Sequence, residues 1–395
     1  MTSNLVPTYA PPDVVFARGA GVYLYDADGK PWLDFIAGIA VNSLGHCHPV
    51  LVEALTAQAN TLWHVSNMFE VPAREQLAQR YCEHTFAEQV FFTNSGTEAI
   101  EGLLKAARKY HAENGQPERI DILTFQGAFH GRSYGAINAG GNPAYLKGFG
   151  PAMAGFTQLP FADEQAFIDA ISENTAAVLI EPVQGEGGLR AAPEEYLRTL
   201  RAKCDETGAL LLYDEIQCGA GRTGKLFAHQ WTDAEPDGMA VAKGVGGGFP
   251  LGAFLLSKKM GENMVVGTHG STYGGNPLAM AVGIALWDEI AKPEMMEHVV
   301  DVGNFLKQQL AGLADEYDDI IIETRGKGLL VGLQLHDQFV AREVVGLARN
   351  EGLLIGAAGE NVIRMAPPLI ITKDHAREAL TKLERALQTA RSQQK

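Results

Sequence analysis

Cysteine is scarce in this 395-residue chain, and its four copies are scattered without a Cys-x-x-Cys pair. The sequence therefore offers neither a disulfide framework nor a zinc-finger arrangement, and it fits a reducing compartment. No apolar run approaches the roughly 18 residues that a membrane-spanning helix needs. The stretch Met1–Pro12 lacks the charged-then-apolar pattern of a signal peptide, so we expect a soluble, cytoplasmic protein.

Clustered positive charge is also missing. The formal net charge is -15 at pH 7, which argues against non-specific nucleic-acid binding, because such binding depends on grouped Lys and Arg. An anionic small-molecule substrate stays compatible, since a pocket can be basic inside an acidic protein. Hydrophobic residues make up 46% and charged residues 20% of the chain, which is an ordinary globular composition.

The length predicts two or three domains. Residues 72–275 alternate apolar runs with helical patterns, which predicts βα units around a largely parallel sheet. We therefore expect a large domain (61–280) and a C-terminal small domain (281–395), with an N-terminal segment (1–60) that joins the small domain. Before residue 72 and after residue 275 we predict strands over residues 14–17, 22–25, 32–35, 320–323, 329–334 and 362–365, and helices over 277–291, 295–313 and 374–391.

One lysine has unusual neighbours. Lys243 ends the apolar run Ala240–Ala242 and is followed by the glycine-rich stretch Gly244–Gly248. Lysine is seldom buried without a partner, and glycines let a bulky group approach the backbone. Taken alone, a lysine that reaches solvent from a strand end is the commoner case. The alternative is an amine nucleophile that forms a Schiff base with a carbonyl group.

Three more apolar runs end in polar or glycine-bearing clusters, as the run before Lys243 does. In open α/β sheets, ligands bind beyond the carboxyl ends of the strands, so these clusters describe one shared site. The runs and their clusters are 90–93 with Asn94–Glu98, 177–180 with Glu181–Gly188, and 210–213 with Asp214–Gln217.

Two of these clusters carry recognisable chemistry. Ser95 and Glu98 have the spacing of a helix capping box, and a helix that starts after a strand offers free N–H groups to a phosphate. A plain capped helix would have the same pattern. Asp214 is either a structural acid or a partner that keeps a pyridine nitrogen protonated, as pyridoxal phosphate chemistry needs.

Two other patterns are not favoured. Gly219–Gly224 spells Gly-x-Gly-x-x-Gly, but no convincing helix start follows it, and Asp237 precedes its strand instead of ending it. Both features argue against binding of a nicotinamide dinucleotide. His46 and His48 could suggest a metal, but no further ligand cluster lies nearby, and we predict no metal site.

Taken together, the motifs resemble those of the class III aminotransferases, which use pyridoxal 5'-phosphate, over nearly the whole chain. The resemblance implies an α/β protein of fold type I among the pyridoxal-phosphate-dependent transferases. This fold has a mixed, mostly parallel sheet in a large domain and a smaller α+β domain. The resemblance also implies that the protein is an obligate homodimer. One departure is Ile100, where relatives often have Asn. The motifs are Gly45–Pro49, Asn94–Ala99, Phe129–Arg132, Glu181–Gly187, Asp214–Gln217, Lys243 and Gly270–Pro277.

The resemblance also implies roles at the cofactor. Lys243 would hold pyridoxal phosphate as a Schiff base and shuttle a proton, and Asp214 would pair with the pyridine nitrogen. The other expected cofactor contacts are Ser95, Gly96 and Thr97 at the phosphate, Phe129 on the ring face, Gln217 near the 3-oxygen, and Thr272 from the other subunit.

For the substrates, the resemblance implies that Arg132, with Ser271 close by, grips the α-carboxylate. Glu186 would mask Arg364 while a long amine donor is bound, and Arg364 would later take the α-carboxylate of 2-oxoglutarate. Near the position of Ile39, ornithine aminotransferases carry a Tyr that helps to hold free ornithine; the apolar Ile39 fits an acylated amine or 4-aminobutyrate better.

The implied reaction therefore moves the terminal amino group of N2-acetyl-L-ornithine to 2-oxoglutarate, in arginine biosynthesis. Donors open to the same chemistry are succinylornithine, N-succinyl-diaminopimelate and 4-aminobutyrate. A rival from another class is a non-catalytic protein that keeps the fold for binding.

Overall fold

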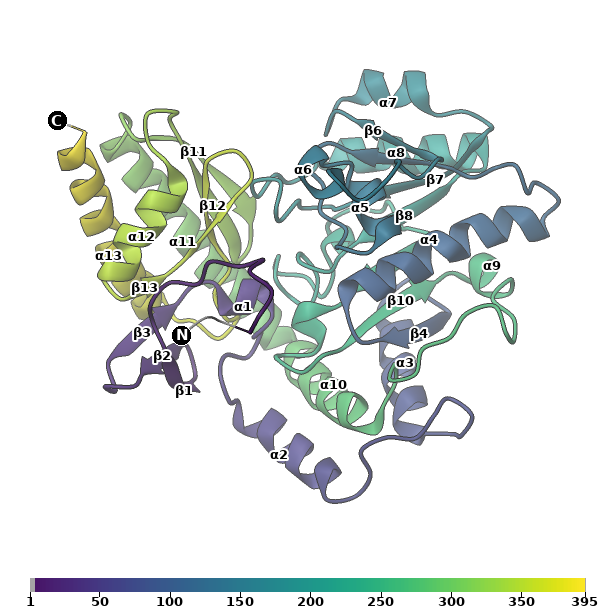
Figure 1. Cartoon of the computed structure of the whole chain (residues 1–395), viewed down its shortest axis with the longest axis horizontal. Helices are drawn as coiled ribbons and strands as arrows, with labels where there is room; N and C mark the ends of the chain where they lie inside the picture. Colours follow the sequence, from purple (N-terminus) through teal and green to yellow (C-terminus); the bar gives the residue numbers. More distant parts are fainter. Residues whose placement is uncertain (1–3, 395) are drawn as a thin grey trace.

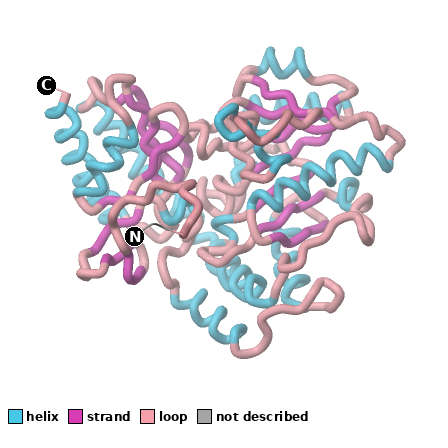
Figure 2. The backbone as a smooth tube through the Cα atoms, in the orientation of Figure 1, coloured by secondary structure: helices cyan, strands magenta, loops and turns pink. Residues whose placement is uncertain are grey.

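The structure is a computed structural model that describes residues 4–394, so Met1–Ser3 of the Met1–Pro12 stretch and the two extreme ends of the predicted domains lie outside it. Two lobes lie side by side (Figure 1, Figure 2). The larger lobe contains the middle of the chain. The smaller lobe contains both ends of the described chain, because the purple and yellow segments of Figure 1 lie together there.

A seven-stranded sheet forms the centre of the larger lobe. Neighbouring strands are parallel from β9 through β8, β7 and β5 to β6, while β10 runs antiparallel to both β9 and β4. This agrees with the prediction of a mixed, mostly parallel sheet. Across the sheet the order is β4 (Gln89–Thr93), β10 (Gly252–Leu256), β9 (Gly238–Val241), β8 (Leu210–Asp214), β7 (Thr175–Ile180), β5 (Asp121–Phe125) and β6 (Phe156–Leu159).

Both faces of this sheet are buried, which explains why its strands are continuous apolar runs. In β7, Ala177 and Leu179 belong to an apolar cluster on the α4 side, whereas Val178 and Ile180 belong to the main core cluster. Successive side chains of a strand point to opposite faces, so each face needs its own helical cover. The helices of this lobe are α2 (Pro49–Ala59), α3 (Pro72–His84), α4 (Gly96–Glu113), α5 (Tyr134–Gly140), α6 (Pro143–Leu146), α7 (Glu164–Ala170), α8 (Glu194–Thr207), α9 (Lys258–Gly261) and α10 (Pro277–Ile290).

The smaller lobe has two four-stranded sheets, ordered β1-β2-β3-β13 and β11-β12-β15-β14. The N-terminal strands join the C-terminal part of the chain because β13 pairs in parallel with β3, with Leu353 opposite Leu33. Its strands are β1 (Phe16–Ala20), β2 (Tyr23–Asp26), β3 (Pro31–Asp34), β11 (Ile321–Lys327), β12 (Leu330–Leu335), β13 (Leu353–Leu354), β14 (Gly356–Ala358) and β15 (Val362–Met365). Its helices are α11 (Pro293–Glu316), α12 (Ala341–Asn350) and α13 (Lys373–Gln393), and the short turn α1 (Ala37–Ala40) follows β3.

Each helix and strand predicted before residue 72 and after residue 275 has a counterpart within a few residues, whereas the exact domain division stays a prediction. Ile100, the departure from the family pattern, is fully buried on α4 in the cluster beneath the sheet. An apolar side chain suits that place, because a buried amide without partners costs free energy. None of the helices within residues 4–394 has the length and apolar character needed to cross a membrane.

The Gly219–Gly224 segment joins the two lobes. It forms hydrogen-bonded turns rather than a helix start, and Gly221 and Gly224 have φ of 82° and 92°. Between them, Arg222 is 1% exposed and donates hydrogen bonds to the carbonyl oxygens of Leu329 and Pro367 in the smaller lobe. The segment is therefore an interlobe contact and lacks the helix that a dinucleotide phosphate site requires.

Candidate active site

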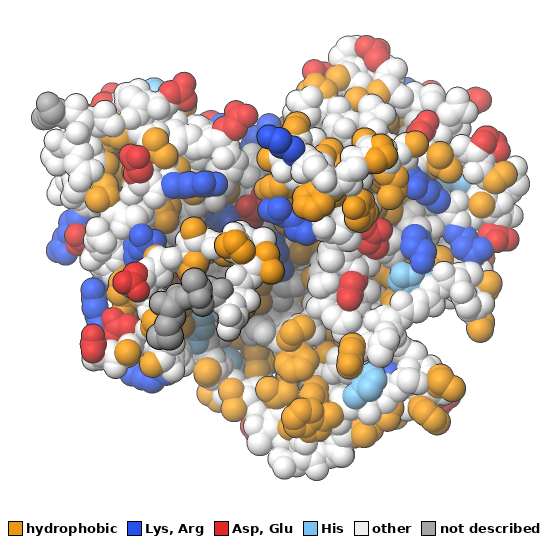
Figure 3. Space-filling model, in the orientation of Figure 1, with side chains coloured by type: hydrophobic (Ala, Val, Ile, Leu, Met, Phe, Trp, Pro, Cys, Tyr) orange, Lys and Arg blue, Asp and Glu red, His pale blue; other side chains and the backbone are white. Residues whose placement is uncertain are grey.

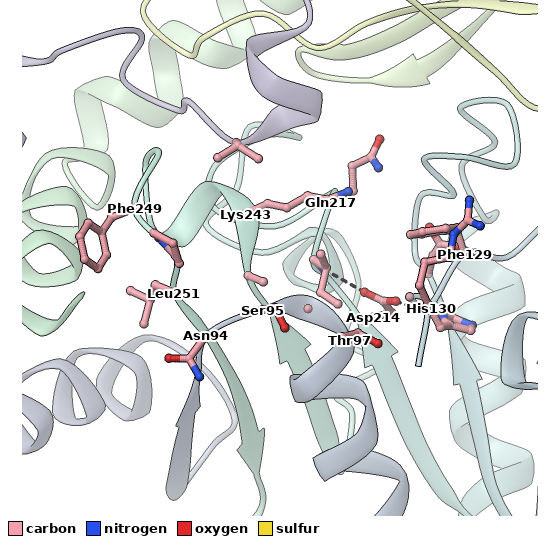
Figure 4. Close-up of a pocket in the computed structure, with 18 of the residues that line it drawn as sticks. Asn94, Ser95, Thr97, Phe129, His130, Asp214, Gln217, Lys243, Phe249 and Leu251 are labelled. Carbon is pink, nitrogen blue, oxygen red and sulfur yellow. Dashed lines mark hydrogen bonds and ion pairs between the residues drawn. The ribbon is translucent and has the colours of Figure 1, made fainter. Parts of the chain in front are cut away.

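A cavity of about 450 Å³ opens at the carboxyl ends of β4, β7, β8 and β9, the place that the strand-end clusters predict. A volume of this size suits a small cofactor with part of a substrate. Figure 4 shows Lys243 extending toward Gln217 above the strand ends, with Asp214 and His130 next to each other below it. Eight predicted site residues line this cavity: Ser95, Gly96, Thr97, Phe129, Arg132, Asp214, Gln217 and Lys243.

Lys243 lies in the first turn after β9. Its φ is 49°, a left-handed conformation that is uncommon outside glycine and costs energy unless the surroundings enforce it. Ser43, itself 1% exposed, donates a 3.0 Å hydrogen bond to the carbonyl of Gly244 and fixes this turn. Burial lowers the pKa of the Lys243 ammonium group, which favours the neutral, nucleophilic amine.

Asp214 ends β8 and is 2% exposed. One carboxylate oxygen lies 2.8 Å from Nδ1 of His130, and the other accepts the N–H of Ile216 at 3.0 Å. Burial opposes the charged form of His130, but the hydrogen bond and the negative charge of Asp214 outweigh it, so the pKa of His130 is raised. The Nε2 atom of His130 is buried and has no partner within the described residues.

Glu181 is a site residue that the sequence reasoning missed. It follows β7 directly, is 4% exposed, and accepts backbone N–H groups from Phe129 at 3.0 Å and Gly185 at 3.1 Å. Burial, and then the charge of Asp214, raise the pKa of Glu181 to about 7. The signal was present in the sequence, because Glu181 ends a fully apolar run as Asp214 does.

The start of α4 offers backbone N–H groups and a positive dipole end to an anion. Ser95 caps this helix by accepting the N–H of Glu98 at 3.5 Å. Thr97 Oγ1 lies 2.6 Å from Ser133 Oγ, and a Cβ at Gly131 would stand 2.6 Å from that same Thr97 oxygen. Glycine is therefore required at 131 so that the Phe129–Arg132 loop can pass close to the helix start.

Glu186 and Arg364 form an ion pair at the boundary of the two lobes. Arg364 belongs to β15 of the smaller lobe and is 4% exposed. The Oε1 of Gln217 accepts a 3.2 Å hydrogen bond from the same guanidinium group, which connects the pair to the cavity. Burial disfavours the charged form of Glu186, but attraction to Arg364 outweighs it and lowers the pKa of Glu186. Arg364 Nε is buried and has no hydrogen-bond partner within residues 4–394.

Thr272 and Ser271 lie in the loop before α10, outside the residues that line the cavity of this chain. Thr272 is exposed, and Ser271 Oγ accepts the N–H of Gly274 at 2.9 Å and an N–H of Asn94 at 3.4 Å. Asn94 does line the cavity, so the loop lies at its edge. The cofactor role of Thr272 and the carboxylate role of Ser271 stay predictions.

The turn α1 brings the N-terminal segment to the cavity, because the next residue, Val41, lines it. All four residues of the turn have φ between 49° and 66°, although only one of them is glycine. Both N–H groups at its start, from Ile36 and Ala37, bond one carboxylate oxygen of Asp34 at 2.9 and 2.8 Å. Ile39 projects from this turn with 43% exposure, so it is free to face a substrate.

His46 is part of the same support and bonds the second oxygen of Asp34 at 2.7 Å. Within the described residues, no three His, Cys, Asp or Glu side chains come together as a metal site.

The residues around the cavity fit pyridoxal phosphate. Lys243 provides an amine, the Asp214 carboxylate is buried where a ring nitrogen needs an acid, and the α4 N-terminus can take a phosphate. The orphaned Nε2 of His130 shows that a polar group is still to be accommodated at the Asp214 end. The chemistry of this donor set therefore matches that of the cofactor, from the amine at one end to the anion site at the other.

Comparisons with known proteins agree with these observations. Residues 6–387 match the family described as Aminotransferase class-III. Acetylornithine aminotransferase 2 of Caulobacter vibrioides is 53% identical over 391 residues, which cover 98% of this chain and 96% of that protein.

Two solved structures extend the comparison. The N-acetylornithine aminotransferase of Stenotrophomonas maltophilia is 37% identical with a TM-score of 0.85, and the match covers 97% of this chain and 98% of that one. An ornithine aminotransferase from Toxoplasma gondii, whose active site holds pyridoxal phosphate at partial occupancy, is 30% identical with a TM-score of 0.94. That match covers 99% of this chain and 93% of that one.

Proposed function

The chain belongs to the class III aminotransferase family, and we propose that it transfers the terminal amino group of N2-acetyl-L-ornithine to 2-oxoglutarate. It is a transaminase that depends on pyridoxal 5'-phosphate. The proposed products are N-acetyl-glutamate 5-semialdehyde and glutamate, a step of arginine biosynthesis. The observation that carries the proposal is the convergence of Lys243 and Asp214 on one cavity, together with relatives named for acetylornithine at about half identity.

Pyridoxal phosphate, when bound, supplies an aldehyde that condenses with amines and a ring that accepts electron density. Asp214 would hold a proton on the ring nitrogen, and His130 behind it keeps the carboxylate oriented and charged. Phe129 and Gln217 would contact the ring of the cofactor. Ser95, Gly96 and Thr97 would hold the phosphate at the start of α4, where free N–H groups and the helix dipole favour an anion.

Lys243 would hold the cofactor through its Nζ, and with the substrate bound it would move a proton from the carbon next to the transferred nitrogen. A lowered pKa suits both steps, since a general base works best when its pKa lies near the operating pH.

Two substrates of different shape use this one site. Arg132, with Ser271 nearby, binds the α-carboxylate of the donor, while Glu186 keeps Arg364 neutralised. When 2-oxoglutarate binds, Glu186 leaves and the Arg364 fork takes the α-carboxylate with two parallel hydrogen bonds. The unpartnered Nε of Arg364 supports this assignment, because a buried donor without a partner is costly unless a ligand satisfies it.

We further propose a homodimer in which Thr272 completes the partner's site. Large apolar side chains gather near the loop that carries this residue, and Figure 3 shows hydrophobic side chains around α2 in the lower part of the molecule. The loop after α2 contacts the loop before α10, since Asn67 donates a 2.8 Å hydrogen bond to the Ser271 carbonyl. The exposed residues are Leu62, Trp63, Met68, Phe69, Val265, Val266 and Tyr273. A second copy that covers them removes a sizeable apolar patch from water.

A cytoplasmic location completes the proposal. All four cysteines are unpaired, including the exposed Cys47, which suits a reducing compartment.

The test is a donor panel with 2-oxoglutarate as acceptor: N2-acetylornithine, N2-succinylornithine, N-succinyl-diaminopimelate, ornithine and 4-aminobutyrate. We expect the highest kcat/KM with N2-acetylornithine and low activity with ornithine, because Ile39 provides no hydroxyl to hold a free α-amine. A higher value with another donor would replace the substrate, and no glutamate from any donor would contradict the activity itself.

A further inference from the structure

The Arg132 guanidinium group forms no ion pair with any acidic side chain among the described residues. It is exposed, and within residues 4–394 it donates no hydrogen bond. What it does contact is aromatic. Its Cζ lies 3.7 Å from the ring centroid of Tyr145 and 5.6 Å from that of Phe129. A long, flexible side chain at the surface would sample many rotamers, so these rings are what restricts its orientation.

A cation held by rings differs from one held by a carboxylate. The stacked guanidinium group keeps all five N–H donors free in the plane of its fork, whereas an acid would occupy two of them. Arg364 is the contrast inside the same protein, because Glu186 and Gln217 already occupy its NH1 group. Stacking therefore orients Arg132 without competing with an incoming carboxylate.

We propose that Tyr145 is a positioning residue for the α-carboxylate of the amine donor: its ring holds the Arg132 fork in the orientation that binds both oxygens. The inference rests on the proposed function, since it assumes that Arg132 meets a donor carboxylate. Tyr145 does not contact the reacting atoms. It acts through Arg132, and no sequence motif marks it, because it lies in the four-residue α6, separated from Arg132 by the helix α5.

The segment that carries Tyr145 is tied to the same wall of the site. Asn142 caps α6 by accepting the N–H of Ala144 at 2.9 Å, and Asn138 on α5 accepts the N–H of Met153 at 2.7 Å. The second bond closes the segment back onto α5, the helix that begins just after Arg132.

The Tyr145 ring also meets Phe129 edge-on, with centroids 6.0 Å apart and planes at 89°. One aromatic pair thus connects the ring that lies against the cofactor to the arginine that binds the donor. Tyr145 and Phe129 also line a second cavity, of about 1040 Å³, between the lobes, so the ring is open on its far side.

The test compares two donors that differ only in the α-carboxylate: N2-acetylornithine and N-acetylputrescine. Their ratio of kcat/KM reports how well the enzyme uses that carboxylate. In a Tyr145→Leu variant we expect the ratio to fall about tenfold, through a higher KM for N2-acetylornithine, while kcat/KM for N-acetylputrescine stays within about twofold. Tyr145→Phe keeps the ring and should keep the ratio, because the Tyr145 hydroxyl has no hydrogen-bond partner within the described residues.

Arg132→Gln provides the reference, with a ratio reduced about 100-fold or more. An unchanged ratio in Tyr145→Leu, or an equal loss with both donors, would overturn the positioning role, because an effect on folding alone acts on both donors alike. Failure of the proposed function is distinct: the wild-type enzyme would then not use N2-acetylornithine. In that case the same ratio, measured for the donor that the panel identifies and its decarboxylated analogue, decides the role of Tyr145.

Discussion

The two ends of the active site are built differently. At the cofactor end, Asp214, Glu181 and Lys243 come from the ends of neighbouring strands. Asp214 and Glu181 are buried and held by short hydrogen bonds, and Ser43 fixes the turn that carries Lys243. At the substrate end, Arg132 is exposed and held by stacking, while Arg364 comes from the other lobe and is neutralised by Glu186.

The difference follows from what each end must do. In the proposed reaction the cofactor stays in place through every cycle, so its partners can be preorganised at the cost of burying charge. Two substrates of unlike shape would alternate at the other end, so the groups there would exchange partners. Different elements therefore hold the cofactor and select the substrates. Substitutions at the two ends should accordingly affect rate and selectivity separately.

The largest effect is expected from Lys243→Ala. Without the amine, neither the covalent link nor the proton transfer at the substrate carbon takes place, and turnover should fall on the order of 10⁴-fold. The measurement is glutamate formation, together with the visible absorbance of the cofactor. A Lys292→Ala variant removes a surface lysine on the linker before α11 and is the matched control. If Lys243→Ala transaminated near the wild-type rate, Lys243 would not be the essential amine of the cofactor end.

The second-largest effect is expected from Asp214→Asn. This variant should lower kcat by about 10² to 10³-fold, because an amide cannot hold a charged ring nitrogen or stabilise the His130 cation. Single-turnover rates with each substrate would measure this, and both half-reactions should slow together. Asp237 is the control, since it is similarly buried but pairs with Arg201 and Lys259 away from the cavity. Asp237→Asn should lower the melting temperature and leave the cofactor spectrum unchanged.

At the substrate end, Glu186→Ala should change selectivity more than rate. With Arg364 no longer masked, the ratio of kcat/KM for glutamate over N2-acetylornithine should rise about tenfold, because the long donor meets an unpaired positive charge. Glu194→Ala, on the exposed start of α8, is the control for loss of a surface acid. If Glu186→Ala keeps the wild-type preference between the two amines, then the proposal that Arg364 exchanges Glu186 for a substrate carboxylate is wrong.

The smallest effect concerns pH. The pKa of Glu181 is raised from 4.5 to about 7, so its contribution to stability is fully present below pH 4.5 and is lost as the pH rises through about 7. Glu181→Gln removes this titration. The free energy of unfolding is measured with urea at pH 5 and at pH 8. Its decrease between these two pH values should be larger in the wild type than in Glu181→Gln, by on the order of 1–3 kcal/mol. Parallel pH profiles would mean that the carboxyl titrates normally.

Much of the cofactor end could be predicted from the sequence. Asp214 and Lys243 follow apolar runs, and runs of this kind become buried strands whose ends meet at one edge of the sheet. The strand β10 was missed, because the Gly246–Pro250 stretch before it reads as a loop and its antiparallel pairing with β4 depends on tertiary contacts.

The substrate end was harder for a physical reason. Its contacts join segments that are distant or irregular: Arg364 meets Glu186 across 178 positions, and Tyr145 reaches Arg132 from the four-residue α6. The left-handed turn at Ala37–Ala40 was also unforeseen, because alanine and isoleucine do not favour positive φ. Hydrogen bonds from its first N–H groups to Asp34 help to enforce it. Local sequence carries no signal for such contacts.

One spectroscopic cycle tests the whole account most directly. The purified holoenzyme is mixed with N2-acetylornithine in the absence of any keto acid, and 2-oxoglutarate is added afterwards while the visible absorbance is followed. We predict that the yellow band falls with the donor alone and returns with the acceptor, because both substrates use one site in turn. A band that ignores N2-acetylornithine but falls with another amine would contradict the donor assignment, and a band that never returns would contradict the exchange of partners at Arg364.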